Sequence, residues 1–343
     1  MPPELVVVWR VTAACDLACL FCGYSRELAR PRRQVRAADA LRFGGVLAEW
    51  QAATGRSVLV SWLGGEPLLW PPLWAVSAAL RARGLRLSVT TNGTRLDVQA
   101  CAQLARDFAQ VTVSVDGLSA WHAQVRGAPG LYARVRAGVL GLAEARARHG
   151  GSDLLIRVNT ILMRSNVRDF EALGAALANW GVDELTFNTL GGADRGGPFY
   201  AAERLRPEDV AEFSAALPAV RARLAERGLH VRGSARYLER LAAQAQDQAW
   251  PVAECGPGRS FLFVDEAGRV APCAFTLENF GRPLAALRTP ADIAQLAGDW
   301  SAAQRRAAPP PCADCRSTQV FEKFALSETR APADWAPLTL VEL

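Results

Sequence analysis

The 343-residue sequence contains a single lysine, Lys323, so its 39 basic residues are almost all arginines. They exceed the 34 acidic residues by five, and they are spread along most of the chain. A nucleic-acid binder usually concentrates its positive charge in one patch or tail. The charge pattern therefore does not indicate a nucleic-acid partner, and we predict none.

The sequence also lacks long apolar runs. None approaches the roughly 20 residues that a membrane-spanning helix needs. The N-terminus, Met1-Pro2-Pro3-Glu4, has neither the basic nor the apolar region of a secretory signal. We therefore expect a cytoplasmic protein with no membrane association. Half of the residues are hydrophobic and 21% are charged, which excludes global disorder and allows a sizeable core.

The eight cysteines are clustered. Three lie together near the N-terminus, Cys101 is alone, and the last four form two pairs: the full set is Cys15, Cys19, Cys22, Cys101, Cys255, Cys273, Cys312 and Cys315. A reducing compartment does not favour a disulfide framework, so the clusters indicate metal ligands. Cys101 falls on a predicted helix and is expected to be a small buried apolar residue.

Up to about residue 230, short apolar runs alternate with longer amphipathic ones. The apolar runs predict strands at Leu5–Val11, Ser57–Leu63, Leu85–Thr90, Val111–Val115, Leu154–Leu162 and Glu184–Leu190. The amphipathic runs predict helices at Arg36–Gln51, Pro72–Arg83, Leu96–Asp107, Leu131–Arg148, Val167–Gly181 and Pro207–Arg227. Six consecutive βα units predict an α/β fold with a parallel sheet and outer helices. Because a closed barrel needs eight, we predict a partial (β/α)6 barrel.

The pattern changes after about residue 250. Ser260–Val264 and Arg269–Pro272 predict a β-hairpin, and Pro290–Arg306 predicts a helix that precedes the last cysteine pair. So few residues cannot form an independent core, so we expect a small metal-stapled appendage. The sequence thus predicts two domains, residues 1–230 and residues 231–343.

The first cysteine cluster, Cys15, Cys19 and Cys22, directly follows the first predicted strand. Three thiolates on one loop can hold three irons of a 4Fe–4S cluster and leave the fourth iron without a protein ligand. Structural zinc needs four ligands, and no histidine or fourth cysteine is close in sequence. The loop lies at the carboxyl end of a strand, where barrels and open parallel sheets place their chemistry.

With Phe21 before its last cysteine, this C-x3-C-x2-C loop resembles the signature of the radical S-adenosylmethionine (radical SAM) enzymes. The resemblance covers about residues 5–230. Gly64-Gly65-Glu66-Pro67, Thr91-Asn92-Gly93 and Ser114-Val115-Asp116-Gly117 match family segments at the ends of strands two, three and four. Each segment alone is also typical of a turn. Together they follow successive strands of one predicted barrel, which favours a functional interpretation.

The resemblance implies how SAM is bound. Glu66 and its glycines would hold the methionyl ammonium, Ser114 and Arg126 the carboxylate, and Asn159 and Ile161 the ribose and adenine. The implied cofactor-binding residues are Phe21, Gly64, Gly65, Glu66, Pro67, Asn92, Ser114, Asp116, Arg126, Asn159 and Ile161. Many relatives have His-Asp where this chain has His122-Ala123, so we assign no role to either residue.

The second cysteine set, Cys255, Cys273, Cys312 and Cys315, resembles the SPASM extension of these enzymes in its shortened "twitch" form. Phe321 and Ala325 stand where the full pattern has further cysteines, which implies one auxiliary cluster. Four cysteines suffice for a fully ligated 4Fe–4S cluster. Spacing alone fits a four-cysteine zinc site equally well, and the attached radical SAM core favours iron–sulfur.

The resemblance also implies an activity. Reduction of the first cluster would cleave SAM to a 5′-deoxyadenosyl radical, which removes a substrate hydrogen. The auxiliary cluster would then accept an electron and complete a two-electron oxidation or a crosslink. A ribosomal peptide or protein is the expected substrate. The alternatives are a dehydrogenase of a small sugar-like alcohol and, from another class, a non-catalytic zinc-stapled binding protein.

The expected partners follow from the same resemblance. The first cysteine loop starts at Cys15, which leaves no room before it for a leader-binding module. This weakens the expectation of a peptide substrate without removing it, because a separate leader-binding protein could supply that function. Candidate substrate contacts are Tyr24, Asn188, Asp194 and Arg195, although each position is also typical of a solvated loop. The basic residues Arg26, Arg30, Arg32, Arg33 and Arg36 indicate a solvated face or a docking surface for a flavodoxin or ferredoxin.

Overall fold

The computed structural model describes residues 4–149, 153–191 and 197–325. Within these residues one 10-stranded sheet runs through the molecule in the order β10-β9-β8-β1-β2-β3-β4-β5-β6-β7. The strands are β1 Leu5–Thr12, β2 Val58–Gly64, β3 Arg86–Thr91, β4 Gln110–Ser114, β5 Leu155–Leu162, β6 Glu184–Thr189, β7 His230–Val231, β8 Phe261–Val264, β9 Arg269–Ala271 and β10 Arg282–Pro283. From β8 through β1 to β7, every neighbouring pair is parallel.

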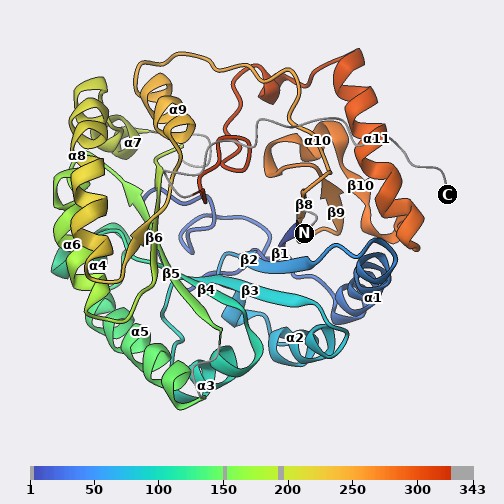
Figure 1. The fold of residues 1–343 in the computed structure, drawn as a ribbon, viewed down its shortest axis with the longest axis horizontal. Helices are drawn as coiled ribbons and strands as arrows, with labels where there is room; N and C mark the ends of the chain where they lie inside the picture. Colours follow the sequence, from blue (N-terminus) through green and yellow to red (C-terminus); the bar gives the residue numbers. More distant parts are fainter. Residues whose placement is uncertain (1–3, 150–152, 192–196, 326–343) are drawn as a thin grey trace.

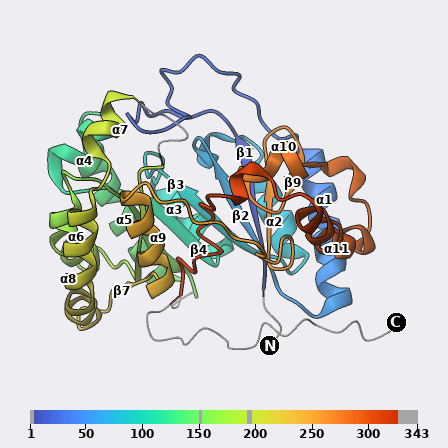
Figure 2. The ribbon, with the colours of Figure 1, turned by 90° about the horizontal axis from the view of Figure 1, so that it is seen from above.

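Helices cover the convex side of this curved sheet (Figures 1 and 2). The α-helices are α1 Ala37–Thr54, α2 Leu73–Ala82, α3 Val98–Asp107, α4 Ser119–Val125, α5 Leu131–Arg148, α6 Phe170–Ala178, α7 Pro198–Glu203, α8 Pro207–Ala225, α9 Ala235–Ala245, α10 Leu277–Phe280 and α11 Pro290–Arg306. The predicted α/β partial barrel is therefore confirmed, and its strands lie within two residues of the predicted ranges.

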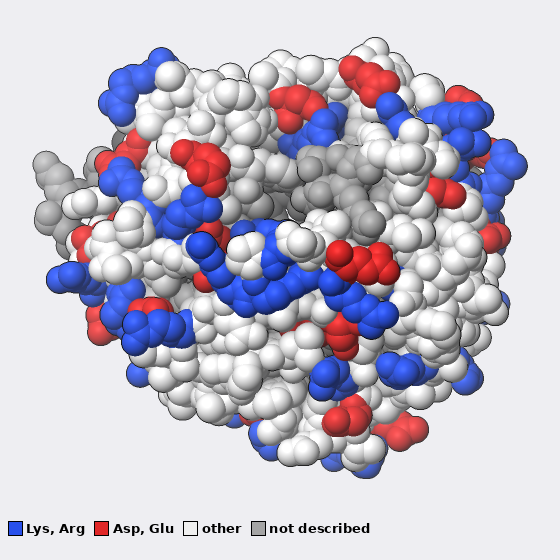
Figure 3. Space-filling model, turned by 180° about the vertical axis from the view of Figure 1, so that it is seen from behind, with Lys and Arg blue, Asp and Glu red and all other residues white. Residues whose placement is uncertain are grey.

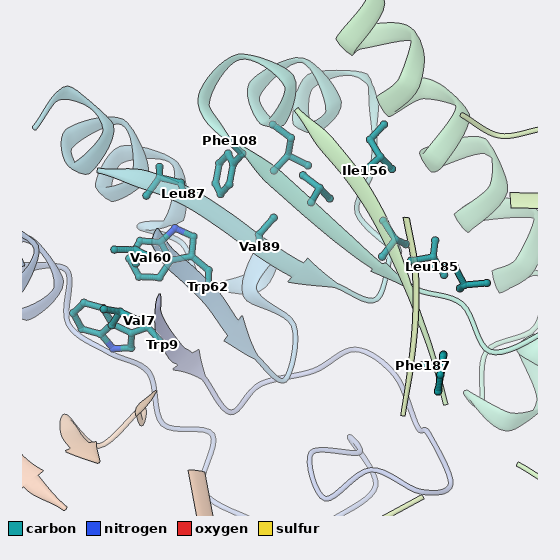
Figure 4. Close-up of a cluster of buried hydrophobic side chains, with 14 of the residues drawn as sticks. Val7, Trp9, Val60, Trp62, Leu87, Val89, Phe108, Ile156, Leu185 and Phe187 are labelled. Atoms are coloured by element: carbon teal, nitrogen blue, oxygen red, sulfur yellow. The ribbon is translucent and has the colours of Figure 1, made fainter. Parts of the chain in front are cut away.

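The strands have two faces that differ in burial. In β1, Leu5, Val7, Trp9 and Val11 are fully buried, while the residues between them are partly exposed. The buried face packs on the helices: the rings of Trp9 and Phe43 in α1 lie edge to face with centroids 5.6 Å apart. Figure 4 shows this layer of branched and aromatic side chains along β1, β2, β3, β5 and β6. The other face lines the barrel interior, and it carries the polar residues of the site.

The C-terminal hairpin extends the barrel. β8 pairs in parallel with β1, from Val6 opposite Phe261 to Trp9 opposite Val264. The sequence predicts the hairpin but not this pairing, because the partner strands lie about 250 residues apart. No break in the sheet marks the predicted division between residues 230 and 231, so the two-domain organisation stays a prediction.

Six α-helices and strands of the described residues were not expected. The elements α4, α7, α10, β7 and β10 are too short to give a periodic pattern, and α9 had no predicted strand before it to mark its start. Ser234 caps α9 by accepting a hydrogen bond from the Tyr237 N–H. In the described part of the chain, no helix is long and apolar enough to cross a membrane.

Candidate functional site

The three-cysteine loop leaves β1 and arches away from the sheet, as the dark blue segment of Figure 2 shows. Cys19 is buried, whereas Cys15 and Cys22 are half-buried. Backbone N–H groups already point at two of the sulfurs: Leu17 N lies 3.5 Å from Cys15 Sγ, and Tyr24 N lies 3.3 Å from Cys22 Sγ. Such N–H···S contacts stabilise thiolates that ligate iron.

Arg32 holds this loop in shape. Its Nη1 donates to the carbonyls of Ala13 and Tyr24 at 3.1 and 3.2 Å, and its Nη2 donates to Ser25 and Leu28 at 2.9 and 3.0 Å. From the sequence, Arg32 is predicted only to belong to a basic surface. The role of Arg32 in holding the loop cannot be predicted from the sequence, because its four partners are backbone carbonyls and every residue has one.

The rest of the basic stretch is divided between the loop and solvent. Arg30 donates to the Gly23 carbonyl at 2.5 Å and stacks over the Tyr24 ring at 4.1 Å. Arg26, Arg33 and Arg36 are exposed. Figure 3 shows a band of basic side chains across the middle of the face seen from behind.

The two glycines after β2 run close against the start of the cysteine loop. Gly65 N donates to the Thr12 carbonyl at 2.8 Å, and Glu66 N donates to the Ala14 carbonyl at 2.8 Å. A Cβ on Gly64 would lie 2.6 Å from the Thr12 oxygen, and one on Gly65 would lie 2.2 Å from the Ala14 oxygen. Only glycine fits here, so the sequence motif has a steric cause.

Glu66 is fully buried and joins two strand ends. Its Oε1 accepts hydrogen bonds from Leu68 N at 3.0 Å and Thr91 Oγ1 at 2.8 Å, and its Oε2 accepts one from Asn92 N at 2.7 Å. Burial raises the pKa of Glu66 to about 7, although the three hydrogen bonds oppose this shift. Oε2 has one donor, so its second lone pair could accept from a ligand ammonium.

Asn92 links the end of β3 to the cysteine loop. Its Nδ2 donates to Asp16 Oδ1 at 2.8 Å and lies 3.8 Å from Cys15 Sγ. Thr94 Oγ1 donates to the other Asp16 oxygen at 2.8 Å. Asp16, which stands inside the Cys15–Cys19 spacing, is a site residue that the sequence analysis did not single out.

A second buried hydrogen-bond network, centred on Asp116, lies at the ends of β4 and β5. Asp116 Oδ2 accepts from Arg126 Nε at 2.7 Å, and Oδ1 accepts from Ile161 N at 2.9 Å. Asn166 Nδ2 donates to the Asp116 carbonyl at 2.6 Å. Burial alone would lower the pKa of Arg126, but the Asp116 carboxylate and the nearby cysteines raise it above its ordinary value. The guanidinium is therefore a permanent positive charge beside Cys19 and Cys22.

His122 packs into the same network. Its Nδ1 accepts from Asp116 N at 3.1 Å, and burial together with Arg126 lowers its pKa to about 4. The ring is therefore neutral and carries its proton on Nε2. Within the described residues this buried Nε2–H has no acceptor.

Asn159 lies on the interior face of β5, next to Ser114 at the end of β4. Its Oδ1 accepts from Thr186 Oγ1 at 3.2 Å and from Lys323 Nζ at 2.6 Å. Lys323 reaches it from the C-terminal segment and is buried. Burial and then the positive charge of Arg157 lower the pKa of Lys323 to about 7. The only lysine of the chain thus contacts Asn159, a predicted cofactor-binding residue. Because this chain otherwise uses arginine for positive charge, a single lysine is a sequence signal for a special role.

The second cysteine set surrounds its own cavity. Cys255, Cys273, Cys312 and Cys315 all line a cavity of about 320 Å3 between the hairpin and α11. Gln304 of α11 lies across it, with Nε2 3.8 Å from both Cys255 Sγ and Cys312 Sγ. Cys101 lies far from both sets; it is buried, and its Sγ donates to the Gly138 carbonyl at 3.6 Å, as expected for a packing residue.

Another cavity, of about 310 Å3, lies between the two cysteine sets. Phe21, Cys22 and Ile161 line it from the barrel side, and Phe275, Arg316 and Phe321 line it from the C-terminal side. We refer to it as the shared cavity. Asn188 lies in its wall, whereas Tyr24 does not. The other two substrate-contact candidates, Asp194 and Arg195, lie outside the described residues.

Both sets fit iron–sulfur clusters. Burial raises the pKa of Cys15 to about 11, of Cys19 to about 12 and of Cys255 to about 11, so without metal these thiols keep their protons. A bound metal deprotonates such ligands outright. Among the described residues, no three His, Cys, Asp or Glu side chains converge on one metal-ion position. A 4Fe–4S cluster takes one cysteine per iron, which the four cysteines that line the second cavity could supply.

The comparison with known proteins agrees with this geometry. Residues 9–172 match the Radical SAM superfamily. These residues are a radical SAM domain. The predicted resemblance is confirmed, and with it the cofactors of the superfamily, a 4Fe–4S cluster and SAM.

The relatives have several activities. An AdoMet-dependent heme synthase from Methanosarcina barkeri is 29% identical over 166 residues, which are 48% of this chain and 44% of that protein. The mycofactocin maturase MftC from Mycobacterium ulcerans is 25% identical over 277 residues, which are 80% of this chain and 69% of that protein. The chain thus covers less than half of the heme synthase.

A solved structure has the same fold. Streptococcus suis SuiB bound to the precursor peptide SuiA superposes with a TM-score of 0.63 and 15% sequence identity. The match covers 95% of this chain and 71% of SuiB, so it extends beyond the radical SAM domain. At this identity the likeness concerns the fold alone.

Proposed function

We propose that this chain is a radical SAM maturase that oxidises or crosslinks a peptide with the help of an auxiliary 4Fe–4S cluster. In this proposal Cys15, Cys19 and Cys22 hold the SAM-binding cluster, and residues 231–343 form the auxiliary cluster domain. The observation that carries it is the shared cavity. Cys22 borders this cavity on one side, and Phe275 and Arg316 border both it and the cavity of the four other cysteines.

When bound by Cys15, Cys19 and Cys22, the first cluster would supply the one-electron reduction of SAM on which hydrogen abstraction from the substrate depends. The protein's part is to bind and to orient. Gly64 and Gly65 let the backbone approach the cofactor, and Glu66 Oε2 accepts its ammonium. Ser114 and Arg126 hold its carboxylate with complementary charge.

The ribose and adenine would lie further along β5. Asn159 has its Oδ1 occupied by Lys323 and Thr186, which leaves its Nδ2 as the donor toward the ribose. Ile161 and Phe21 supply apolar surface for the base and border the shared cavity. Asn92 and Asp116 are proposed to position other groups. Asn92 holds the cysteine loop through Asp16, and Asp116 holds Arg126 and the end of β5.

Four cysteines of the C-terminal region would hold the auxiliary cluster, which would supply an electron acceptor for the oxidation of the substrate. Cys255, Cys273, Cys312 and Cys315 give each iron one protein ligand, so no iron is left open to chelate substrate. A closed cluster next to the shared cavity is suited to electron transfer, and the enzyme would therefore be an oxidoreductase.

A peptide is the proposed substrate because the relatives that cover most of this chain include a maturase, and SuiB is solved with a precursor peptide. The volume of the shared cavity, about 310 Å3, fits one or two side chains and equally a small molecule. The dehydrogenase of a small sugar-like alcohol is therefore the second candidate.

The first cluster also needs an electron donor. The exposed Arg26, Arg33 and Arg36 follow the cysteine loop, and acidic flavodoxins or ferredoxins would dock on such a surface by charge complementarity. Reducing the charge of this surface should weaken the donor's binding more at low salt than at high salt.

The proposal is tested by anaerobic reconstitution with iron and sulfide, followed by reduction in the presence of SAM. We expect a brown protein with about eight irons per chain and reductant-dependent 5′-deoxyadenosine. A colourless protein that holds zinc and leaves SAM intact would overturn the proposal in favour of a zinc-stapled binding protein.

A further inference from the structure

In the wall of the shared cavity, side-chain acceptors have hydrogen-bond partners, whereas one buried donor has none among the described residues. Two of its side-chain acceptors are occupied. Asn188 Oδ1 lies 3.0 Å from Tyr237 Oη, whose proton it shares with the Phe187 carbonyl at 2.8 Å, and Gln244 Oε1 accepts from Thr189 Oγ1 at 3.1 Å. The Gln244 amide donates to the Leu190 carbonyl at 2.7 Å.

One strong donor of the wall is not used. Arg240 is 4% exposed; its Nε donates to the Cys315 carbonyl at 2.8 Å and its Nη2 to Asp314 Oδ1 at 2.7 Å. Its Nη1 is buried and has no acceptor within the described residues. A buried charged donor without a partner is costly, so this position calls for an acceptor.

Asn188 supplies a second donor. Because Tyr237 Oη holds its Oδ1, the amide nitrogen is the end left for a ligand, and no described residue accepts from it. The described lining contains two arginines, Arg240 and Arg316, and neither aspartate nor glutamate. Asp314, which does not line the cavity, forms ion pairs with both arginines. One carboxylate balances only one of the two positive charges.

The remaining wall is apolar and aromatic. The rings of Phe21, Phe199, Tyr200, Phe275 and Phe321 line the cavity. A ligand that fits this wall presents an apolar or aromatic group to the rings and an anionic acceptor to the two donors.

We infer that the shared cavity binds a carboxylate attached to an aromatic or branched apolar group, with Arg240 and Asn188 as its specificity-determining residues. The inference rests on the proposed function, in which this cavity is the substrate site. The carboxylate could belong to a peptide or to a small acid.

Isothermal titration calorimetry of the full, cluster-loaded chain tests the inference. The probes are N-acetylphenylalanine, its amide, and the tripeptide acetyl-Ala-Ala-Phe with a free or an amidated C-terminus. We expect each acid that enters the cavity to bind at least about tenfold more tightly than its amide. A preference in both pairs supports a peptide carboxylate, and a preference in the single residue alone supports a small acid.

Two variants locate the effect. Asn188→Asp keeps the acceptor for Tyr237 and replaces the free donor by a negative charge, and Arg240→Gln removes the guanidinium. Both should abolish the preference for the acid. Arg168→Gln, which removes one positive charge from an exposed pair with Glu212, should retain it.

Equal binding of acids and amides, or a preference that survives both variants, would overturn the inference. The same preparations are assayed for 5′-deoxyadenosine without any probe. Intact SAM cleavage with no acid preference contradicts the inference alone, whereas absent cleavage contradicts the proposed function.

Discussion

The first three cysteines lie on one loop, which side chains after β3 hold through Asp16 and which borders buried polar networks at the ends of β2, β4 and β5. The other four cysteines come from three separate segments with few such links. Glu66, Asn92 and Asp116 each join two or more segments around the first set. Around the second set, Cys255 is exposed, and the connections are mainly backbone hydrogen bonds and the side chains of Gln304 and Arg240.

This difference indicates that the two sites depend on metal in different ways. We infer that the barrel forms the first site without iron, because Glu66, Asn92 and Asp116 find their hydrogen-bond partners within the protein. The second lies in a region with a small core, for which a cluster would act as a staple.

The largest effect is expected at the Asp116–Arg126 pair. Arg126→Leu leaves the Asp116 carboxylate buried without its charge partner and should lower the free energy of unfolding by about 3–5 kcal/mol. Urea denaturation of the metal-free chain measures it. Arg168→Gln, at an exposed pair, is the matched control and should change stability by about 0.5 kcal/mol or less. A small loss in Arg126→Leu would mean that the barrel does not preform the first site.

Glu66→Gln should have an intermediate effect. The amide can keep two hydrogen bonds, but its NH2 group would face either the Asn92 N–H or the Leu68 N–H, which costs roughly 1–3 kcal/mol of stability. The variant should also bind SAM about tenfold more weakly, because the ammonium loses a charged acceptor. Unfolding and SAM titrations separate the two effects. Unchanged SAM affinity with reduced stability would show that Glu66 only braces the strand ends.

Lys323 should make stability depend on pH. Its pKa is lowered to about 7 in the folded chain, whereas in the unfolded chain it stays near the ordinary lysine value of about 10.4. Between these values the unfolded chain binds more protons, so stability rises with pH. We therefore expect wild type to gain stability relative to Lys323→Met from about pH 7 to 10. Parallel stability profiles for the two proteins would contradict this.

The smallest effect is expected at Gln304. Gln304→Leu removes the amide beside Cys255 Sγ and Cys312 Sγ, and loss of an N–H···S contact should shift the auxiliary cluster to a more negative potential. Redox titration followed by electron paramagnetic resonance measures the shift. The first cluster is the internal control, and its potential should stay unchanged. A shift at the first cluster would contradict the separation of the sites.

The sequence predicts most of the fold because its βα units are long and periodic. β7 escapes prediction because it has two residues, and the β8–β1 pairing escapes because it joins distant segments. In the site, the cysteines and glycines were identifiable since iron ligation and close backbone approach restrict the residue type. Arg32, Asn166 and Gln304 were not, because an arginine or amide at such positions is usually solvated.

Separate roles for the two cysteine sets can be tested by comparing two variants, each with all or part of one set replaced by alanine. Reductive cleavage of SAM and iron content are measured for the Cys15/Cys19/Cys22→Ala and the Cys312/Cys315→Ala proteins after reconstitution. Each should retain about four irons. The first should lose all 5′-deoxyadenosine formation and stay folded, while the second should still cleave SAM but yield no modified product. Complete loss of cleavage in both variants, with folding intact, would contradict the account.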